Sequence, residues 1–399
     1  MKINKFKPRH WLYLTLFGVN TLIAVALRPL TKFRRKKSPI RQVILYGHRL
    51  SGNLLALHRY ISKHHIDEFQ LTFLTMDPEY HKRLCDQGVH ASLGTHPSAI
   101  TLMSTADAVI SDHGLHSMLP LLWLSDVKFF DVWHGIPFKG FDENDFKTQH
   151  RYTEIWVASP LMAELYGEKF GFPREKICIT GYARTDSLII PQETDEQIRE
   201  RFGLQLTSGK KLVLFAPTWK QDSNDRTLFP FGINPEIFLR DISRLCQQHD
   251  AVPVLRTHLN AKLSENLTDE AIEFLPFDQF PDTEALLQIT DVLICDWSSI
   301  AFDFLLLDRP TIFLDVPPPF AKGFSLGKKH RFDRVVGSYG ELLKTLGKSL
   351  ENDPGRRQQN SEKRRLMADS IYSQYADGQS ARRCAARLTQ HLISNGSFQ

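Results

Sequence analysis

The fold is best inferred from the sequence Leu293-Ile294-Cys295-Asp296-Trp297-Ser298-Ser299-Ile300-Ala301-Phe302-Asp303-Phe304, in which an apolar run is followed by an acidic residue and two serines. The apolar run at 292–295 predicts a buried strand. Two serines then open a segment in which Ile300, Phe304 and Leu307 have the spacing of one helix face. The stretch therefore predicts a strand, a tight turn and a helix.

The start of this predicted helix is suited to an anion. Ser298 is a candidate for the N-cap, and Asp303 falls in the early helix. The first turn of a helix offers unpaired N–H groups and a positive dipole end. The hydroxyls of Ser298 and Ser299 would add donors for phosphate oxygens. We interpret the stretch as the phosphate-holding element of a nucleotide-dependent enzyme; the alternative is an ordinary capped helix after a strand.

The same alternation of strand and helix extends outward over most of the chain. Apolar runs predict strands at 42–46, 71–75, 107–110, 127–133, 154–158, 177–180, 212–216, 252–255, 272–275, 292–295 and 311–314. Helical segments are expected at 54–61, 115–122 and 235–248, and from Pro160 after a capping Ser159. Such alternation is typical of α/β folds with parallel sheets. Two runs of it, separated near 188–208, predict two doubly wound, Rossmann-like domains that face a cleft.

The predicted organisation has four parts. A leader with a membrane-associated helix covers 1–41, and Rossmann-like domains cover 42–190 and 205–340. The tail at 341–399 is rich in Arg and Lys, for which solvated helices are the simplest account.

Composition excludes several classes of protein. With 399 residues, 42% hydrophobic and 24% charged, the chain has the make-up of a globular protein of about two domains. The net charge of +5 is mild, and much of the basic excess precedes residue 42, which argues against a nucleic-acid binder. The five cysteines are scattered and show neither zinc-site spacing nor a disulfide framework, in keeping with a reducing cytoplasm.

The leader combines an uncharged run from Trp11 to Leu27 with basic residues on both sides. It fits either a short transmembrane anchor or a helix lying in the interface of an anionic membrane. A core helix of a soluble fold is the third alternative. The heavier basic flank is C-terminal, so we expect the large domains on the cytoplasmic face of the cell membrane.

Unusual residues gather where the predicted strands end, which is where ligands bind in open parallel sheets. The first domain supplies the runs 131–139 and 181–186. The second supplies 215–220, 255–258 and 296–299. No Gly-rich Walker or dinucleotide motif is present, so phosphate must be held in another way.

These runs resemble a known family. Trp-His-Gly-x-Pro-x-Lys, Gly-Tyr-x-Arg-x-Asp, Ala-Pro-Thr-Trp, Leu-Arg-x-His and Asp-x-Ser-Ser-x-x-Phe-Asp-Phe occur in this order in the CDP-glycerol glycerophosphotransferases, the primases and polymerases of wall teichoic acid. The resemblance covers roughly residues 43–315. It implies a glycosyltransferase-B fold with an acceptor domain followed by a donor domain, a cytoplasmic peripheral membrane protein, and CDP-glycerol or a related CDP-polyol as donor. The acceptor would be lipid-linked or membrane-associated.

Two histidines are the candidate catalytic residues. An acceptor hydroxyl that attacks the donor's β-phosphorus must lose its proton, and an imidazole with a pKa of about 6.5 is a suitable base. We assign this role to His134; the alternative is a structural loop histidine. His258 is placed with Arg256 at the pyrophosphate, where positive charge stabilises the leaving group.

The remaining assignments complete the predicted site. Donor-binding residues are Arg256, Thr218, Asp296, Ser298, Ser299 and Asp303, and acceptor-binding residues are Lys139 and Arg184. Asp303 could equally favour the helix N-terminus, and Lys139 and Arg184 could be solvated loop charges. No carboxylate cluster of metal-site type stands out, so neither a metal nor a cofactor is predicted. Two alternatives stay open: a sugar-nucleotide-dependent glycosyltransferase or epimerase, and a non-catalytic membrane-tethered assembly factor.

Overall fold

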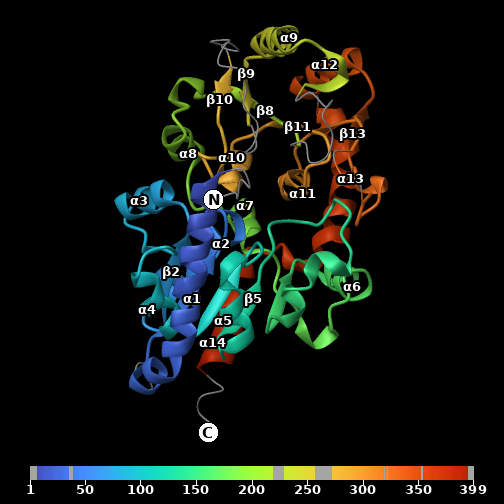
Figure 1. Cartoon of the computed structure of the whole chain (residues 1–399). Helices are drawn as coiled ribbons and strands as arrows, with labels where there is room; N and C mark the ends of the chain where they lie inside the picture. Colours follow the sequence, from blue (N-terminus) through green and yellow to red (C-terminus); the bar gives the residue numbers. More distant parts are fainter. Residues whose placement is uncertain are drawn as a thin grey trace. The chain divides into compact units, whose positions relative to one another are not determined.

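The computed structural model describes residues 7–35, 39–218, 229–256, 272–318, 320, 322–351 and 354–393, and their contacts divide the chain into two units. Unit 1 contains residues 1–134, 143–186 and 379–399, and unit 2 contains 135–142 and 187–378. Each unit is built on one parallel sheet with helices on its faces (Figure 1). This confirms the predicted α/β class with two doubly wound domains.

The sheet of unit 1 has the strand order β3-β2-β1-β4-β5-β6-β7, with every pair parallel. Its strands are β1 (Arg41–Tyr46), β2 (Phe69–Thr75), β3 (Ala91–Leu93), β4 (Ala108–Ser111), β5 (Lys128–Asp131), β6 (Glu154–Val157) and β7 (Ile177–Ile179). Its helices are α1 (Pro8–Arg35), α2 (Gly52–His64), α3 (Pro78–Asp86), α4 (Ser98–Thr105), α5 (Leu119–Leu124), α6 (Pro160–Glu168) and α14 (Ser380–Leu392). Short 3₁₀ turns are η1 (His116–Met118), η2 (Glu143–Phe146), η3 (Gln149–Arg151), η4 (Arg174–Lys176) and η5 (Ala183–Thr185).

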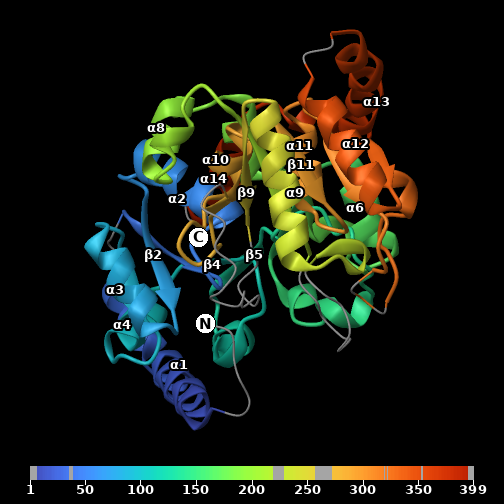
Figure 2. The ribbon, with the colours of Figure 1, turned by 90° about the horizontal axis from the view of Figure 1, so that it is seen from above.

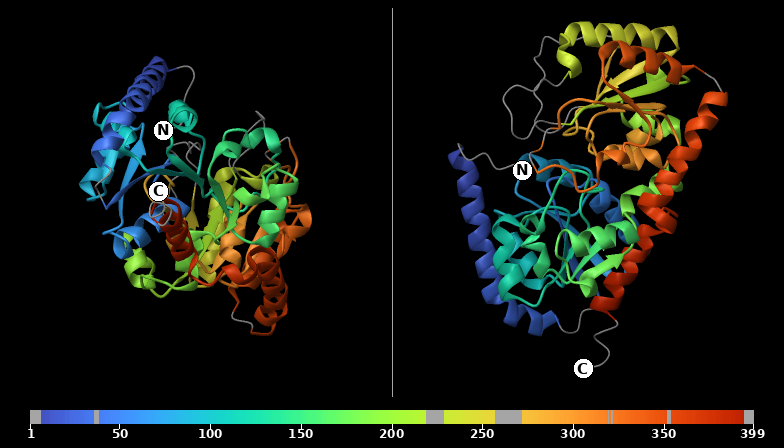
Figure 3. Two further views of the ribbon diagram at one scale, coloured as in Figure 1. Left: turned by 90° about the horizontal axis from the view of Figure 1, so that it is seen from below. Right: turned by 90° about the vertical axis from the view of Figure 1, so that its right-hand side faces the viewer.

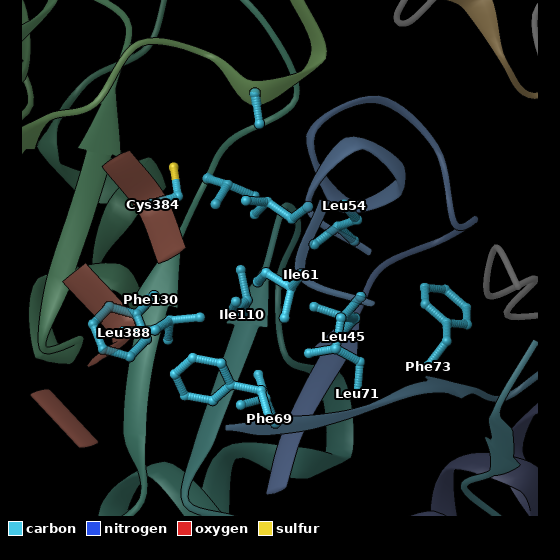
Figure 4. Close-up of a cluster of buried hydrophobic side chains, with 14 of the residues drawn as sticks. Leu45, Leu54, Ile61, Phe69, Leu71, Phe73, Ile110, Phe130, Cys384 and Leu388 are labelled. Carbon is cyan, nitrogen blue, oxygen red and sulfur yellow. The ribbon is translucent and has the colours of Figure 1, made fainter. Parts of the chain in front are cut away.

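Successive side chains of β1 point to opposite faces of the sheet, so unit 1 has a hydrophobic core on each face. Val43 and Leu45 point to one face, against α2, α3 and α14, whereas Ile44 and Tyr46 point to the other, against α1, α4 and α5. Figure 4 shows the first of these clusters, in which Leu388 of α14 lies beside Phe130 of β5.

Unit 2 has the strand order β10-β9-β8-β11-β12-β13, again all parallel. The strands are β8 (Lys211–Ala216), β9 (Ala251–Leu255), β10 (Glu273–Phe274), β11 (Val292–Cys295), β12 (Thr311–Leu314) and β13 (Arg334–Val336). The helices are α7 (Asp186–Ile189, at the unit boundary), α8 (Asp195–Arg201), α9 (Pro235–Gln248), α10 (Thr283–Gln288), α11 (Ile300–Leu305), α12 (Tyr339–Leu350) and α13 (Pro354–Tyr372). The turns are η6 (Gln205–Thr207), η7 (Pro230–Gly232), η8 (Lys328–His330) and η9 (Ser373–Tyr375). Helices α9 and α12 lie side by side over one face (Figure 2).

The structure differs from the sequence-based expectation for the tail. Helix α12 buries Leu342, Leu346 and Leu350 in the core of unit 2, and α14 buries Cys384 and Leu388 in unit 1. The tail is therefore not a set of solvated helices. In Figure 3 the chain runs through the long helix α13 before it reaches α14.

Helix α1 packs on unit 1 through one face only. Phe17, Thr21 and Ala24 are fully buried against α4, α5 and η1, whereas Trp11, Leu16, Val19, Ile23 and Leu27 are exposed. Among the described residues, Pro8–Thr31 is the one helical stretch that has the length and apolar composition for crossing a membrane, and 22% of its most apolar window is buried. The helix thus joins a small buried face to a broad exposed apolar face.

Candidate active site

The strand-end residues of unit 1 gather where the strand order reverses. β1 and β4 are adjacent, with Tyr46 opposite Ser111, so His48 after β1 and Asp112-His113 after β4 leave the sheet together. β5 lies on the other side of β4 and leads to His134. The carboxyl ends of strands at such a reversal are the usual ligand-binding edge of open α/β sheets.

A strained turn carries His134 away from β5. Trp133 has a φ of 43°, in the left-handed region that bulky residues seldom adopt. Asp131 Oδ1 accepts a hydrogen bond from Trp133 N at 2.9 Å. Asn53 Nδ2, on α2, donates to the carbonyl oxygens of Val132 at 2.7 Å and Trp133 at 2.9 Å. The predicted strand 127–133 therefore ends early, at Asp131, because these bonds bend the chain.

Arg184 braces the same turn from η5. Its backbone N donates to Asn53 Oδ1 at 3.0 Å, and its Nη1 donates to the carbonyl oxygen of His134 at 2.8 Å. The side chain is buried. The structure thus brings together His134 and Arg184, and the guanidinium contacts the backbone of the candidate base.

The contacts of His134 fix its tautomer. Its Nδ1 lies 3.0 Å from the carbonyl oxygen of Asp112, which can only accept, so Nδ1 carries the hydrogen in this contact. In the neutral ring, Nε2 then has the lone pair. The residue is exposed. This is the form that a general base requires.

Four histidine rings cluster beside this turn. The His113 and His134 rings are stacked, with centroids 4.5 Å apart and planes 12° apart. The His48 ring centroid lies 4.4 Å from that of His113 with the two planes tilted by 53°, and the His116 centroid lies 5.9 Å from that of His48. His113 Nδ1 is 2.6 Å from Asp112 Oδ1.

The members of this cluster differ in charge. Burial alone would lower the pKa of His113, but the Asp112 carboxylate outweighs it and raises that pKa. Burial, with the positive charge of His113, lowers the pKa of His48 to about 2. Burial also lowers the pKa of His116, to about 4. At neutral pH, His48 and His116 are therefore uncharged, whereas the Asp112 carboxylate shifts the equilibrium of His113 toward its charged form.

Asp131 lies beneath the turn and is fully buried. Desolvation, opposed by the hydrogen bond from Trp133 N and reinforced by the Asp112 charge, raises its pKa to about 7. Its buried Oδ2 has no hydrogen-bond partner within the described part of the chain. Sequence reasoning did not single out Asn53, Asp112 or His113, because no motif marks them and their partners are distant in sequence.

On unit 2, Asp296 joins the two strand ends at the equivalent reversal, between β8 and β11. Its Oδ1 accepts from Thr218 N at 2.8 Å, from the Thr218 hydroxyl and from Trp297 N at 2.7 Å. The carboxyl is buried. These bonds shape the loop, and the predicted donor contacts of Thr218 and Asp296 stay predictions.

The helix after this turn starts later than predicted. The N-cap of α11 is Ser299 rather than Ser298, and its side chain makes no capping bond; the helix covers only Ile300–Leu305. Ser298 Oγ lies 3.5 Å from Ile300 N, and both serines are half-buried. Asp303 is buried and accepts from the Tyr372 hydroxyl at 3.3 Å, a contact that favours its structural alternative.

Arg256 directly follows β9, and its guanidinium group is buried. Its Nη2 donates to the carbonyl oxygen of Phe280 at 2.9 Å and to Thr283 Oγ1 at 2.8 Å, whereas the buried Nη1 has no hydrogen-bond partner among the residues that the structure describes. Desolvation lowers its pKa to about 10, so it keeps its charge at neutral pH. An unpaired buried guanidinium nitrogen suits an anionic ligand.

Lys139 belongs to the short segment of unit 2 that follows His134. In this segment Gly140 N donates to Gly323 O at 2.7 Å, and Ser325 N donates to Phe138 O at 3.1 Å. A Cβ on Gly140 would lie 2.2 Å from the Lys322 carbonyl oxygen, so this pairing requires glycine. Lys139 is half-buried, with Nζ 4.9 Å from the Phe141 ring centroid.

Part of the predicted site cannot be placed. His258 lies outside the described residues, and so do Trp219 and Lys220 at the end of the run 215–220. Within the described ranges, no group of three His, Cys, Asp or Glu side chains is arranged to hold a metal ion.

Comparisons with known proteins point in one direction. The teichoic acid ribitol-phosphate polymerase TarK of Staphylococcus aureus is 25% identical over 327 residues, which cover 77% of this chain and 59% of that protein. A teichoic acid poly(glycerol phosphate) polymerase of Bacillus spizizenii is 26% identical over 257 residues, covering 59% of this chain and 64% of that protein. The matched part thus spans less than two thirds of either relative.

Among solved structures, the wall teichoic acid polymerase TagF matches 98% of this chain and 99% of that chain, with a TM-score of 0.70 and 20% identity. A UDP-GlcNAc 2-epimerase from Neisseria meningitidis also shares the fold, with a TM-score of 0.56 and 12% identity. The motifs in the sequence, in contrast, are those of one family. Its model, described as CDP-glycerol:poly(glycerophosphate) glycerophosphotransferase, matches residues 30–390, and the chain belongs to that family.

Proposed function

We propose that the chain is a transferase that moves glycerol phosphate, or a related polyol phosphate, from a CDP-activated donor to a membrane-associated, lipid-linked acceptor. The product is a phosphodiester in a teichoic-acid-like or capsular polymer. The observation that carries the proposal is the contact of His134 Nδ1 with the Asp112 carbonyl oxygen, which places the lone pair of the neutral ring on Nε2. Family membership supplies the donor class.

In the proposed reaction, an acceptor hydroxyl attacks the β-phosphorus of the donor. The new O–P bond forms as the bond to CMP breaks, and the hydroxyl proton passes to His134 Nε2. Negative charge develops on the departing CMP phosphate. Arg256 and His258 are assigned to stabilise that charge, with the backbone and hydroxyls of Ser298 and Ser299 completing an anion site.

The other predicted residues take supporting roles. The buried oxygen of Asp296 holds Thr218, so these two residues define the loop that would line the donor pocket. Asp303 is the weakest donor assignment, because Tyr372 already contacts it. Lys139 and Arg184 would attract an anionic acceptor, and Arg184 does so while bracing the base.

A panel of activated donors tests this proposal. Purified full-length protein is incubated with an acceptor and with CDP-glycerol, CDP-ribitol or a UDP-sugar, and the released nucleotide is measured with and without EDTA. We expect CMP from a CDP-polyol, at the same rate in EDTA. Release of UDP would favour the glycosyltransferase or epimerase alternative that the shared fold leaves open. Polymer synthesis in cells that survives both His134→Ala and His258→Ala would favour the non-catalytic alternative.

We also propose that the protein lies on the membrane through α1 rather than crossing it. The buried face of α1 makes polar bonds with unit 1: Asn20 Nδ2 donates to Gly94 O at 3.0 Å, and Arg28 pairs with Asp126 at 2.6 Å. Crossing a bilayer would break these bonds and expose Arg28 to hydrocarbon, which is costly. The exposed apolar face, with Trp11 at one end, is suited to the interface of the cytoplasmic leaflet.

A further inference from the structure

His113 is a titratable residue beside the candidate base that the proposed reaction does not use. Its ring centroid is 4.5 Å from that of His134 and 4.4 Å from that of His48, and its plane is 12° from that of His134. A parallel, stacked ring restricts rotation of His134 about its side-chain bonds. The bond from His134 Nδ1 to the Asp112 backbone fixes one end of that ring, and the stack fixes its face.

The surroundings of His134 contain charges of both signs. Asp112 and His113 approach from the end of β4, His48 from the end of β1, Asp131 from β5 and Arg184 from η5. Arg184 contacts the backbone oxygen of His134, and Asp131 contacts the backbone of Trp133. Of these groups, His113 is the one that can carry a charge on a ring stacked against the His134 ring.

The Asp112 carboxylate favours the charged form of His113. The 2.6 Å contact between Asp112 Oδ1 and His113 Nδ1 is an ion pair when His113 is protonated. The side chain of Asp112 is 6% exposed. The raised pKa of His113 agrees with this pairing. The His113 ring meets the His134 ring face to face, whereas the Asp112 carboxylate contacts the edge of the His113 ring at Nδ1.

We propose that His113, paired with Asp112 and stacked on His134, is a positioning residue that holds the His134 ring and, through its charge, keeps that ring neutral between turnovers. This inference rests on the proposed function, because it assumes that His134 takes up the acceptor proton. After the transfer, His134 carries that proton beside a second positive charge. The repulsion favours release of the proton to water, which returns the base to its starting state.

Two substitutions of His113 separate the effect of its ring from the effect of its charge. His113→Phe keeps an aromatic ring for the stack and removes the charge, whereas His113→Ala removes both. Asp112→Asn keeps the backbone oxygen that holds His134 Nδ1 and removes the carboxylate. His90→Phe, at an exposed histidine of unit 1 outside the site, is the matched control.

The measurements are the NMR titration of His134 in the full-length protein with ¹³C-labelled histidine, and the pH profile of kcat/KM for CMP release. In His113→Phe, loss of the positive neighbour raises the His134 titration midpoint by about one pH unit, and the acidic limb of the profile moves equally. Asp112→Asn gives a smaller upward shift, because both charges of the pair are lost. His113→Ala adds a fall in kcat at pH 8 of about tenfold, which His113→Phe does not show.

A His134 midpoint that does not move in either His113→Phe or Asp112→Asn overturns the inference. So does an equal loss of kcat at pH 8 in His113→Phe and His113→Ala, because the ring would then have no separate effect. If the midpoint shifts but the wild-type protein releases no CMP, the inference about the ring pair stands and the proposed function fails. The titration thus tells the two failures apart.

Discussion

Trp133 is the residue at which backbone strain and buried hydrogen bonds meet. Its φ of 43° is unfavourable for a bulky side chain, by about 1–3 kcal/mol. Asn53 offsets this by satisfying two carbonyl oxygens of the turn and accepting from Arg184 N. The backbone position of His134 therefore depends on hydrogen bonds made by the Asn53 side-chain amide.

Asn53→Ala should loosen this turn. Two buried carbonyl oxygens lose their donor, which costs about 2 kcal/mol or more, and Trp133 can relax. We expect a lower Tm and at least a tenfold loss of CMP release, measured with Ser62→Ala as the control, an exposed polar residue of the same helix. Activity equal to that of the control would show that the turn holds without Asn53.

Asp131→Asn should make stability less sensitive to pH. The folded pKa of Asp131, about 7, exceeds the usual unfolded value of about 3.9, so the folded state binds the extra proton between these values. Wild-type stability therefore falls as pH rises from about 4 to 7, by up to about 4 kcal/mol. Asn mimics the protonated carboxyl and removes this fall. The difference in Tm between variant and wild type should grow from pH 5 to pH 8; a constant difference would contradict the assignment.

At this scale the sequence pointed to only some of the residues that the structure brings together in the candidate site. His134 could be found because it belongs to a recognisable motif, and Arg184 because it lies in another. Asn53, Asp112 and His113 could not, since their importance comes from contacts between residues about 20 to 130 positions apart.

Among the elements, buried strands were the most predictable. The runs at 292–295 and 311–314 match β11 and β12 residue for residue, because both faces of these strands are covered. β3 and β13 were missed: each has three residues, too few for a period to show. Helix α9 was found with its bounds because Asn234 and Pro235 mark its start and the apolar spacing continues to its end.

Helix α1 allows a direct test at the element scale. Ile23 lies on its exposed apolar face, at 40% exposure, so Ile23→Glu should leave the fold intact. We expect at least tenfold weaker binding to vesicles that contain anionic lipid, measured by cosedimentation. Ile66→Glu, at an exposed apolar residue of unit 1 outside α1, is the control and should bind like the wild type.

Equal binding by both variants would mean that the exposed face of α1 is not the membrane contact. A complementary measurement distinguishes lying from crossing. Cysteines introduced at His10 and at Thr31, near the two ends of the helix, should both react with an impermeant reagent on the cytoplasmic side. Protection of one of them would indicate a transmembrane helix.

Over the whole molecule, the chain passes between the units four times, at 134–135, 142–143, 186–187 and 378–379. The first of these crossings directly follows His134, and the last delivers α14 to the core of unit 1. Burial alone would raise the pKa of Glu154 in β6, but hydrogen bonds from His391 and Arg387 of α14 lower that pKa to about 2 and hold the helix. Sequence periodicity could not reveal this return, because it depends on contacts between residues more than 230 positions apart, such as Glu154 and Arg387.

The most direct test of the central claim is the rate of CMP release from a CDP-polyol by wild-type protein and by His134→Gln, at pH 8 with saturating acceptor. If His134 Nε2 takes the acceptor proton, kcat falls by about 10²–10⁴-fold in His134→Gln while the KM for the donor changes little. A kcat within about threefold of the wild type would contradict the account.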